Sequence, residues 1–454
     1  MPRTIIRNAT IVTMDPERRV LVGHDLVVEG DRIAALAPAS QTRVEAGDDA
    51  IDGRGRLVLP GFVNTHVHTV QQLGRGLADD VDLMTLLHGR VFPYESNVGP
   101  EDSYASTLLF GLEQIQNGTT TFADAGIQHV EPTVRAVTEL GIRGALCLSI
   151  TDDGDGLPAG WKLPTDECLA IQEEAFGTVN GAADGRLRWW LGLRTLFNNS
   201  DRLLEGTAAL AERLDTRAHM HVAQSPGEVG YCRATRGTTV ARHLDRMGLL
   251  SERLLAVHGL YLEEEELDLL AERRVSVSHS PGAGLKIMGL PKIVGMLDRG
   301  ITVGLATDSG ASNNRNSMPD EMWLATLLQK GAHANPSALT AQQVLAMATI
   351  DAARALGWDA EIGSLEVGKK ADLCVIDPWT ANMQPLHDPI AALVFCMKSE
   401  NITHTMCDGV WLMRDRQLTR LNATEVLREA SARALAIGQR AGIALPPRFP
   451  TVHA

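Results

Sequence analysis

Leu57-Val58-Leu59-Pro60-Gly61-Phe62-Val63-Asn64-Thr65-His66-Val67-His68 is the most informative stretch of this chain. His66 and His68 lie two residues apart, and every second side chain of a β-strand points to the same face. Two imidazoles on one face are placed to share a divalent metal. The pair alone also fits two ordinary histidines on a hydrated strand. The metal interpretation is favoured because later segments supply further ligands.

Composition limits the class of protein. The 454 residues are enough for one large catalytic domain and a smaller companion, and 44% hydrophobic with 22% charged residues is typical of a soluble globular protein. A net charge of −14 disfavours nucleic acid and anionic membranes as partners, and we expect a small-molecule substrate. We expect no signal peptide and no membrane-spanning run. Six cysteines without a C-x-x-C pair favour a reducing cytoplasm.

The order of strand and helix patterns predicts the fold class. Residues 4–58 contain short strands separated by turns, as expected of a small β-sheet. From residue 60 onward, apolar strands alternate with amphipathic helices. With the His66 strand, the candidate strands are 118–124, 141–150, 188–195, 217–224, 254–258, 275–280 and 301–308. Eight such units over roughly 250 residues match a TIM barrel.

The C-terminal part returns to other patterns. Thr340 is expected to cap a helix over 341–356, and residues 362–377 show turn-and-strand chemistry. A further strand is predicted over 404–413 and an amphipathic helix over 424–441.

We therefore predict an α/β protein in which a (β/α)8 TIM-like barrel is inserted in a small β-sandwich formed by both chain ends. The sandwich comprises residues 1–58 and 362–420, and the barrel comprises residues 59–361. Residues 421–454 form a C-terminal helix and tail.

Metal-competent side chains gather at the carboxyl ends of the predicted barrel strands, where barrel enzymes place their active sites. These residues are His66, His68, His219, His221, His258, His279 and Asp308. A single histidine is more often structural than a ligand. Such groups on five strand ends indicate one common site.

At this point the chain resembles the amidohydrolase superfamily over nearly its whole length. The resemblance rests on the 59–68 stretch, Gly118-Thr119-Thr120-Thr121, Thr307-Asp308 followed by Ser312-Asn313-Asn314, and the 363–377 run. The branch it resembles contains the cytosine, adenosine and triazine aminohydrolases. Arg75-Gly76-Leu77-Ala78-Asp79-Asp80 is similar to methylthioadenosine deaminases in particular.

The resemblance implies roles for individual residues. His66, His68, His221 and Asp308 would hold one metal, and His219 would be structural. Relatives with two metals carry a bridging lysine on the fourth strand, which residues 188–195 lack. Zinc is favoured by the ligand set, and iron, cobalt or manganese are alternatives.

The reaction of the family assigns the remaining catalytic residues. A bound ion lowers the pKa of its water, and Asp308 would take up the proton and pass it to the leaving group. His258 would stabilise the charge that develops at the reacting carbon. A homo-oligomer is implied by the resemblance alone.

Two positions depart from the family pattern. Gln224 stands where these aminohydrolases have a glutamate, and an amide has no proton to shuttle to a ring nitrogen. His279, acting through water, could supply that shuttle instead. Arg194 replaces a histidine that helps to bind substrate. It could clamp a substrate carbonyl or carboxylate, or simply pair with an internal acid such as Asp152 or Asp153.

The segment 70–93 and its flank are expected to wall an apolar pocket for a neutral organic substrate, although core packing is the default for such residues. Leu86, Phe92 and Asn198 are the candidate substrate contacts besides Arg194. The other apolar wall residues expected here are Leu73, Leu83, Met84 and Tyr94.

These departures favour hydrolysis of a C–N bond next to a carbonyl, in a urea, carbamate or amide, as in the phenylurea and thiocarbamate hydrolases. The first alternative is an aminohydrolase of a pyrimidine, purine or s-triazine. The second is a catalytically inactive structural homologue, which the retained metal residues argue against. The zinc signature of nucleic-acid deaminases is absent.

Overall fold

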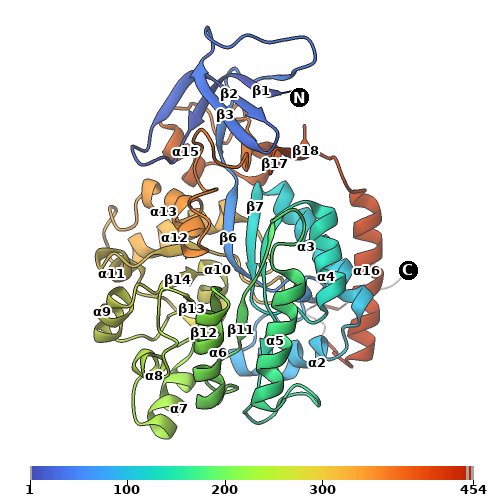
Figure 1. The fold of residues 1–454 in the computed structure, drawn as a ribbon, viewed down its shortest axis with the longest axis vertical. Helices are drawn as coiled ribbons and strands as arrows, with labels where there is room; N and C mark the ends of the chain where they lie inside the picture. The colour runs from blue at the N-terminus through green and yellow to red at the C-terminus, as the bar shows by residue number, and fades with distance from the viewer. Residues whose placement is uncertain (1–2, 446–448, 451–454) are drawn as a thin grey trace.

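Both ends of the chain meet in one sheet, at the top of Figure 1, in the computed structural model, which describes residues 3–445 and 449–450. The strands are β1 (Thr4–Val12), β2 (Val20–Glu29), β3 (Arg32–Pro38), β4 (Asp49–Asp52), β5 (Leu57–Pro60), β16 (Leu373–Ile376), β17 (Ile402–Cys407), β18 (Val410–Arg414) and β19 (Gln417–Leu418). β5 joins the two ends, since it pairs with β1 on one side and β16 on the other. These strands form a single hydrogen-bonded sheet, so the sandwich arrangement stays a prediction.

The middle of the chain forms two sheets of parallel strands, which makes the protein α/β. Their orders are β10-β8-β7-β6 and β15-β14-β13-β12-β11-β9. The strands are β6 (Phe62–Val67), β7 (Thr119–Asp124), β8 (Arg143–Leu146), β9 (Ser149–Ile150), β10 (Leu187–Trp189), β11 (Leu191–Leu193), β12 (Ala218–Val222), β13 (Leu254–His258), β14 (Ser276–His279) and β15 (Val303–Leu305). Every predicted barrel strand overlaps one or two of these.

Two predicted strands are interrupted. The segment 141–150 divides into β8 and β9, and the segment 188–195 divides into β10 and β11. In each case the first piece pairs within the smaller sheet and the second piece within the larger one. At the other edge of both sheets, the Asp308 backbone N–H donates to the His66 carbonyl at 3.0 Å. The two sheets are therefore adjacent at both of their edges.

Helices cover the outside of these sheets (Figure 1). They are α3 (Pro100–Gln116), α4 (Val130–Leu140), α5 (Thr165–Val179), α6 (Asp201–Arg213), α7 (Pro226–Arg236), α8 (Val240–Arg246), α9 (Glu264–Glu272), α11 (Ile293–Asp298) and α12 (Met318–Ala332). Short helical turns η1 (Thr69–Gly74), α1 (Leu83–Leu86), η2 (Leu87–Val91) and α2 (Phe92–Glu95) follow β6, and α10 (Pro281–Ala283) and η3 (Gly284–Met288) follow β14. Connections at the carboxyl ends of the strands thus carry short helices of their own.

Two C-terminal predictions need correction. The predicted helix over 341–356 is two helices, α13 (Ala341–Met347) and α14 (Ile350–Ala355), because the Ala348 carbonyl turns to accept from the Val63 backbone N–H at 2.9 Å. Thr340 does cap the first of them. The predicted strand over 404–413 is a hairpin of β17 and β18, because Asp408 and Gly409 both adopt positive φ, the geometry of a two-residue turn.

Helix α16 (Ala423–Arg440) confirms the predicted amphipathic C-terminal helix. It packs along α3, where Arg433 and Arg440 both contact the buried Asp102 carboxylate. The predicted tail extends into residues 446–448 and 451–454, which lie outside the described residues. The helix α15 (Pro389–Phe395) completes the C-terminal segment. Among the described helices, none is both long enough and apolar enough to cross a bilayer.

A buried ion-pair network joins the terminal sheet to the parallel strands. Arg143 of β8 is 1% exposed and donates to Asp372 at 3.2–3.3 Å and to Asp408 at 3.1 Å. Asp372 and Asp408 belong to the C-terminal segment that completes the terminal sheet. Because the Arg143 guanidinium is buried, these carboxylates must balance its charge, since burial of an unpaired charge costs free energy.

We predict that Arg143→Met destabilises the protein by about 3–5 kcal/mol, because it leaves the buried Asp372 carboxylate without its cation, whereas Asp408 keeps Lys370 at 3.0 Å. Urea unfolding measures this change. The matched control is Arg54→Met, since Arg54 pairs with Asp52 on the exposed surface; its expected cost is below about 1 kcal/mol. Equal losses for the two variants would contradict the structural role of the network.

Candidate active site

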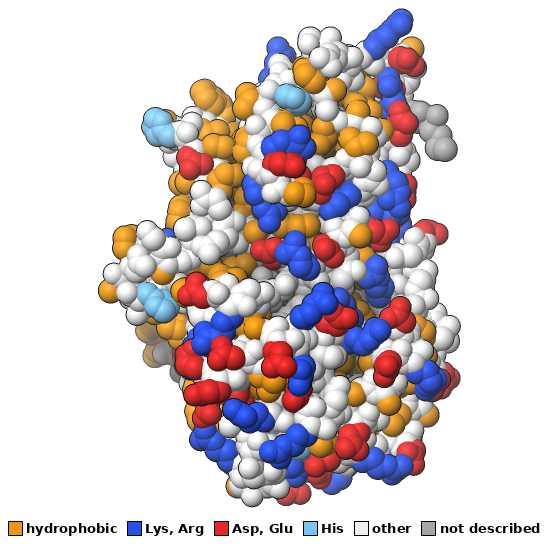
Figure 2. Space-filling model, turned by 60° about the vertical axis from the view of Figure 1, so that its left-hand side comes forward, with side chains coloured by type: hydrophobic (Ala, Val, Ile, Leu, Met, Phe, Trp, Pro, Cys, Tyr) orange, Lys and Arg blue, Asp and Glu red, His pale blue; other side chains and the backbone are white. Residues whose placement is uncertain are grey.

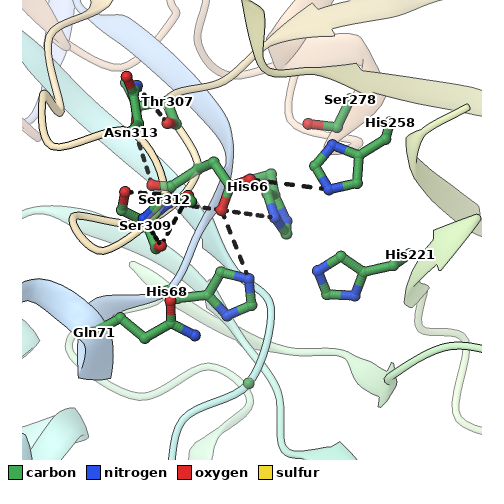
Figure 3. Close-up of polar contacts among 12 residues, drawn as sticks. His66, His68, Gln71, His221, His258, Ser278, Thr307, Ser309, Ser312 and Asn313 are labelled. Atoms are coloured by element: carbon green, nitrogen blue, oxygen red, sulfur yellow. Dashed lines mark hydrogen bonds and ion pairs between the residues drawn. The ribbon is translucent and has the colours of Figure 1, made fainter. Parts of the chain in front are cut away.

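Four imidazoles and one carboxylate meet at the carboxyl ends of the parallel strands. The rings of His66, His68, His221 and His258 face a common centre (Figure 3). The Asp308 carboxylate lies 3.6 Å from His66 Nε2, 3.9 Å from His68 Nε2 and 3.9 Å from His258 Nε2. Potential ligand atoms of His66, His68 and Asp308 all lie within 4.8 Å of one another, and so do those of His66, His221 and His258.

The backbone is strained at two of these positions. His258 has φ 72° and Asp308 has φ 62°, a left-handed conformation that is uncommon for residues other than glycine. At Asp308 the strain is held by the backbone bond to the His66 carbonyl and by the Ser309 N–H, which donates to its carboxylate at 2.6 Å. Strained backbone of this kind concentrates at functional sites. Here it turns both side chains back toward the cluster.

Burial and mutual contact shape the electrostatics of the cluster. Burial is the main reason why the pKa values of His68 and His221 lie well below their ordinary range, and the nearby imidazoles add to it. For His258, burial lowers the pKa to about 4 although Asp308 opposes the shift. Burial alone would raise the pKa of the Asp308 carboxyl, but contacts with His66, His258 and His68 hold it below its ordinary value. Neutral imidazoles and an ionised carboxylate are the protonation states that a metal needs.

A cavity of about 340 Å³ opens onto the cluster. Its walls include the metal-competent residues His68, His221, His258 and Asp308 together with the predicted substrate contacts Leu86, Phe92, Arg194 and Asn198. Leu83 and Met84 also line it, as predicted. Leu73 and Tyr94 do not: they pack with Val70 against Ile437 of α16 instead, because their segment turns under that helix.

Arg194 carries the largest correction to the predicted contacts. Its guanidinium lies 3.7 Å from Glu95 and not against Asp152 or Asp153. Asp152 is already occupied, since it accepts from the Ser200 N–H at 2.7 Å and from two hydroxyls. The Asp153 carboxylate instead lies 3.4 Å from Lys162.

The guanidinium of Arg194 is placed to receive a ligand. It lies over the ring of Phe92 at 4.7 Å and near that of Trp161 at 5.5 Å, and it lines the cavity. Within the described part of the chain, its N–H groups make no hydrogen bond to any residue. Burial lowers its pKa, while Glu95 opposes that shift. A guanidinium that lines a cavity with donors to spare suits a carbonyl or carboxylate oxygen.

Gln71 was missed by the sequence reasoning, and Glu95 was missed with it. The Gln71 amide N–H donates to Glu95 at 2.7 Å, and both side chains are buried. A carboxylate only accepts, so the Gln71 Nε2 must face Glu95 and its Oε1 is left to the cavity that Gln71 lines. The one available signal was position, since Gln71 follows three residues after His68.

Gln224 lies in the cavity wall as predicted. Its backbone N–H donates to the Glu228 carboxylate at 2.9 Å, and the other Glu228 oxygen accepts from the Leu196 N–H at 3.4 Å. Burial raises the pKa of Glu228 to about 7. Glu228 thereby ties the ends of β12 and β11 together, and the Gln224 side-chain amide remains available to a ligand.

Two further predicted residues have distinct environments. Asn198 lines the cavity, where its side-chain oxygen accepts from the Thr195 hydroxyl at 3.0 Å. His279 is 1% exposed and is not among the residues that line this cavity. Burial lowers its pKa to about 3. The role of His279 as a proton shuttle stays a prediction, because its side chain does not line the cavity in which a ligand would bind.

Comparison with known proteins identifies the family. The model of the amidohydrolase family matches residues 57–412, so the chain belongs to this family. It is 36% identical over 408 residues to a 5'-deoxyadenosine deaminase of Methanobrevibacter smithii, covering 89% of this chain and 92% of the relative.

Solved structures agree with this assignment. An adenosine deaminase from Xanthomonas campestris with bound zinc superposes with a TM-score of 0.90 at 30% identity, covering 97% of this chain and 99% of the other. The atrazine chlorohydrolase of Arthrobacter aurescens TC1, complexed with zinc, superposes with a TM-score of 0.88 at 26% identity, covering 95% and 100%. The chain is a metal-dependent hydrolase of carbon–nitrogen bonds. The 5'-deoxyadenosine deaminase and the adenosine deaminase among these relatives support the heterocycle alternative more than urea or carbamate hydrolysis.

The residues present fit a divalent ion such as zinc. His66 Nε2 is fully buried and has no hydrogen-bond partner among the described residues, although it faces the cluster. Three imidazoles and one carboxylate form a donor set that zinc accepts. His66, His68, His221 and Asp308 are the residues that would hold it.

We predict that Asp308→Asn and His66→Ala weaken zinc binding, because the first replaces the anionic ligand by a neutral amide and the second removes an imidazole from the only cluster of this kind among the described residues. Elemental analysis after dialysis against a chelator should show clearly less zinc per chain in each variant than in the native protein. His24→Ala, which changes a histidine on β2 far from the cluster, is the control and should keep its metal. Full occupancy in Asp308→Asn would contradict the assignment of this ligand.

Proposed function

We propose that this chain is a hydrolytic deaminase of an amino-substituted nitrogen heterocycle that also carries a ring carbonyl. The class of reaction is supported by the deaminase relatives. The preference for a carbonyl rests on one observation: the Arg194 guanidinium lines the cavity and makes no hydrogen bond to any residue that the structure describes. Arg194 and Gln71 together offer donors beside an acceptor, which matches the –NH–C(=O)– edge of an oxo-heterocycle.

Gln224 supports the same class of substrate. A glutamate at this position could protonate a ring nitrogen, whereas an amide can only donate or accept a hydrogen bond. A heterocycle in its lactam form already carries hydrogen on ring nitrogen. The Gln224 Oε1 can accept from that N–H and so orient the ring, while the neighbouring ring nitrogen without hydrogen, which gains charge as water adds, would receive its proton by way of Asp308.

The remaining residues account for hydrolysis. When bound, a divalent ion supplies a water that is acidic near neutral pH. The Asp308 carboxylate would carry the two protons of that water in turn, one to the unprotonated ring nitrogen beside the reacting carbon and one to the departing amine, so that the C–N bond breaks as ammonia leaves. His258, beside Asp308 in the cavity wall, donates to the atom that gains charge at the reacting carbon. Phe92 and Leu86 supply the apolar faces against which a flat ring packs.

Hydrolysis of a urea, carbamate or amide is the second candidate. Gln224 favours it, since a carbonyl carbon needs no ring protonation. It releases a substituted amine, or ammonia from an unsubstituted end, and therefore differs from deamination in its products.

We also infer that the two parallel sheets are two arcs of one (β/α)8 barrel spanning residues 59–361. The shared interrupted strands and the backbone bond from Asp308 to His66 support this closure. The terminal segments 1–58 and 362–420 then form a companion domain, and 421–454 a C-terminal extension. The cysteines are free and five of six are buried, which supports a reducing cytoplasm. A homo-oligomer stays a prediction.

We predict ammonia release from amino-heterocycles with a ring carbonyl, such as guanine, cytosine and isocytosine, at a higher kcat/KM than from adenosine or 5'-deoxyadenosine. Arg194→Met should lower kcat/KM for the oxo-heterocycles about 10- to 100-fold, the value of a hydrogen bond to a charged group. The same variant should change kcat/KM for adenosine by about twofold at most, because adenosine has no ring carbonyl to accept such a bond. An ammonia-coupled assay with mass spectrometry of the products measures both.

The double variant Arg194→Met, Glu95→Gln removes the buried carboxylate that the single variant leaves unpaired. A preference for adenosine in the native protein, unaltered in both variants, would contradict the proposed substrate class. Release of a substituted amine from ureas with no ammonia from any heterocycle would favour the second candidate.

We predict that Gln224→Glu raises ammonia release from 5'-deoxyadenosine by about 10-fold or more, because it restores a general acid and such groups contribute about 10²–10⁴-fold. The control is Gln41→Glu, the same change at an exposed loop position. No gain in the position 224 variant would mean that protonation of the ring nitrogen does not limit this substrate.

A further inference from the structure

His219 links a metal-competent histidine to the backbone of a neighbouring strand. Its Nε2 lies 3.0 Å from Nδ1 of His66, and its Nδ1 lies 3.2 Å from the carbonyl oxygen of Asp124. His219 is 2% exposed and His66 is fully buried. Water therefore has little access to replace either contact.

The chain of contacts fixes the proton positions. A carbonyl oxygen only accepts, so His219 Nδ1 must carry the N–H that faces Asp124. A neutral imidazole has one N–H, which leaves His219 Nε2 as an acceptor. His66 Nδ1 must then donate to it, and His66 Nε2 is left with its lone pair facing the cluster.

The orphaned atom of His66 agrees with this assignment. His66 Nε2 is buried and has no hydrogen-bond partner among the described residues. A lone pair aimed at Asp308 from 3.6 Å repels the carboxylate unless a cation lies between them. The relay therefore produces the one tautomer of His66 that suits a metal ligand.

His221 shows why a relay is needed at His66. The Nδ1 of His221 lies 2.9 Å from the carbonyl of Arg194, so its tautomer is set directly by backbone. Among the described residues, no backbone carbonyl accepts from the Nδ1 of His66, and His219 is its partner instead. His219 and His221 are both on β12, two residues apart and on the same face, so one strand supports both ligands.

We propose that His219 is a positioning residue that sets the tautomer and ring orientation of His66 for metal binding. Through His219, the hydrogen bond to the Asp124 carbonyl fixes which nitrogen of His66 carries the proton. A neutral imidazole does this without adding a charge to the buried interior. Partners of this kind typically contribute 10- to 100-fold to metal affinity. The inference concerns metal affinity and does not depend on which substrate is hydrolysed.

The test is zinc affinity of the purified full chain, measured by competition with a chromophoric chelator. We expect His219→Phe, which keeps the ring volume, to bind zinc about 10- to 100-fold more weakly. His219→Gln should recover most of that affinity, because its amide can accept from His66 and donate to Asp124. The matched control is His243→Phe. His243 is a buried histidine on the outer helix α8 that is hydrogen-bonded to Asp201, and its replacement should leave the zinc affinity unchanged.

If His219→Phe binds zinc within about twofold of the native affinity, the proposal is overturned, because a loss of about 10- to 100-fold is expected. Should His219→Phe fail to fold, the native chain still decides the question. In metal-free protein with ¹⁵N-labelled histidine, long-range ¹H–¹⁵N spectra report the tautomer of each ring, and His66→Ala identifies the His66 signals. A proton on Nδ1 of His66 is expected, and a proton on Nε2 would overturn the proposal.

Discussion

The structure depends on one electrostatic constraint, a carboxylate buried among four imidazoles. Asp308 is 5% exposed and His66 is fully buried, so neither can rely on water for stabilisation. The rings must be neutral to be buried, and the carboxylate then lacks a full positive charge beside it. A divalent cation satisfies both requirements. The strained backbone of Asp308 and His258 and the bond from Asp308 to β6 hold this arrangement together.

The cavity around this centre has one polar wall and one apolar wall. The wall next to the cluster is polar and contains Gln224, Arg194 and Gln71, while Phe92 and Leu86 are apolar. Glu95 lies behind the polar wall and orients two of its members, the guanidinium of Arg194 and the amide of Gln71. On the face that Figure 2 presents, acidic and basic side chains are intermixed, although the net charge is −14.

Most of the chemistry could be predicted from residue types at strand ends. His66, His68, His221, His258 and Asp308 were all placed by the alternation of strands and helices, and all five meet. The departures at Gln224 and Arg194 were also visible in the sequence. The partner of Arg194 was not, because a guanidinium is satisfied by any nearby acid, and Glu95 reaches it only through the fold of the short helices η1 to α2. Gln71 carries no distinctive pattern, and its role follows from Glu95.

The sequence by itself determined the α/β class, the metal-competent residues and the approximate positions of the barrel strands, because hydrophobic periodicity acts over a few residues. It could not determine the break between α13 and α14, where the Ala348 carbonyl leaves the helix for β6. Nor could it assign His219 a contact with His66, since the two rings are 153 residues apart in the chain. Such contacts, and the proton positions that they impose, depend on how distant strands lie side by side. Tertiary structure alone decides that, because the free energy of each contact is gained only when the whole strand arrangement has formed.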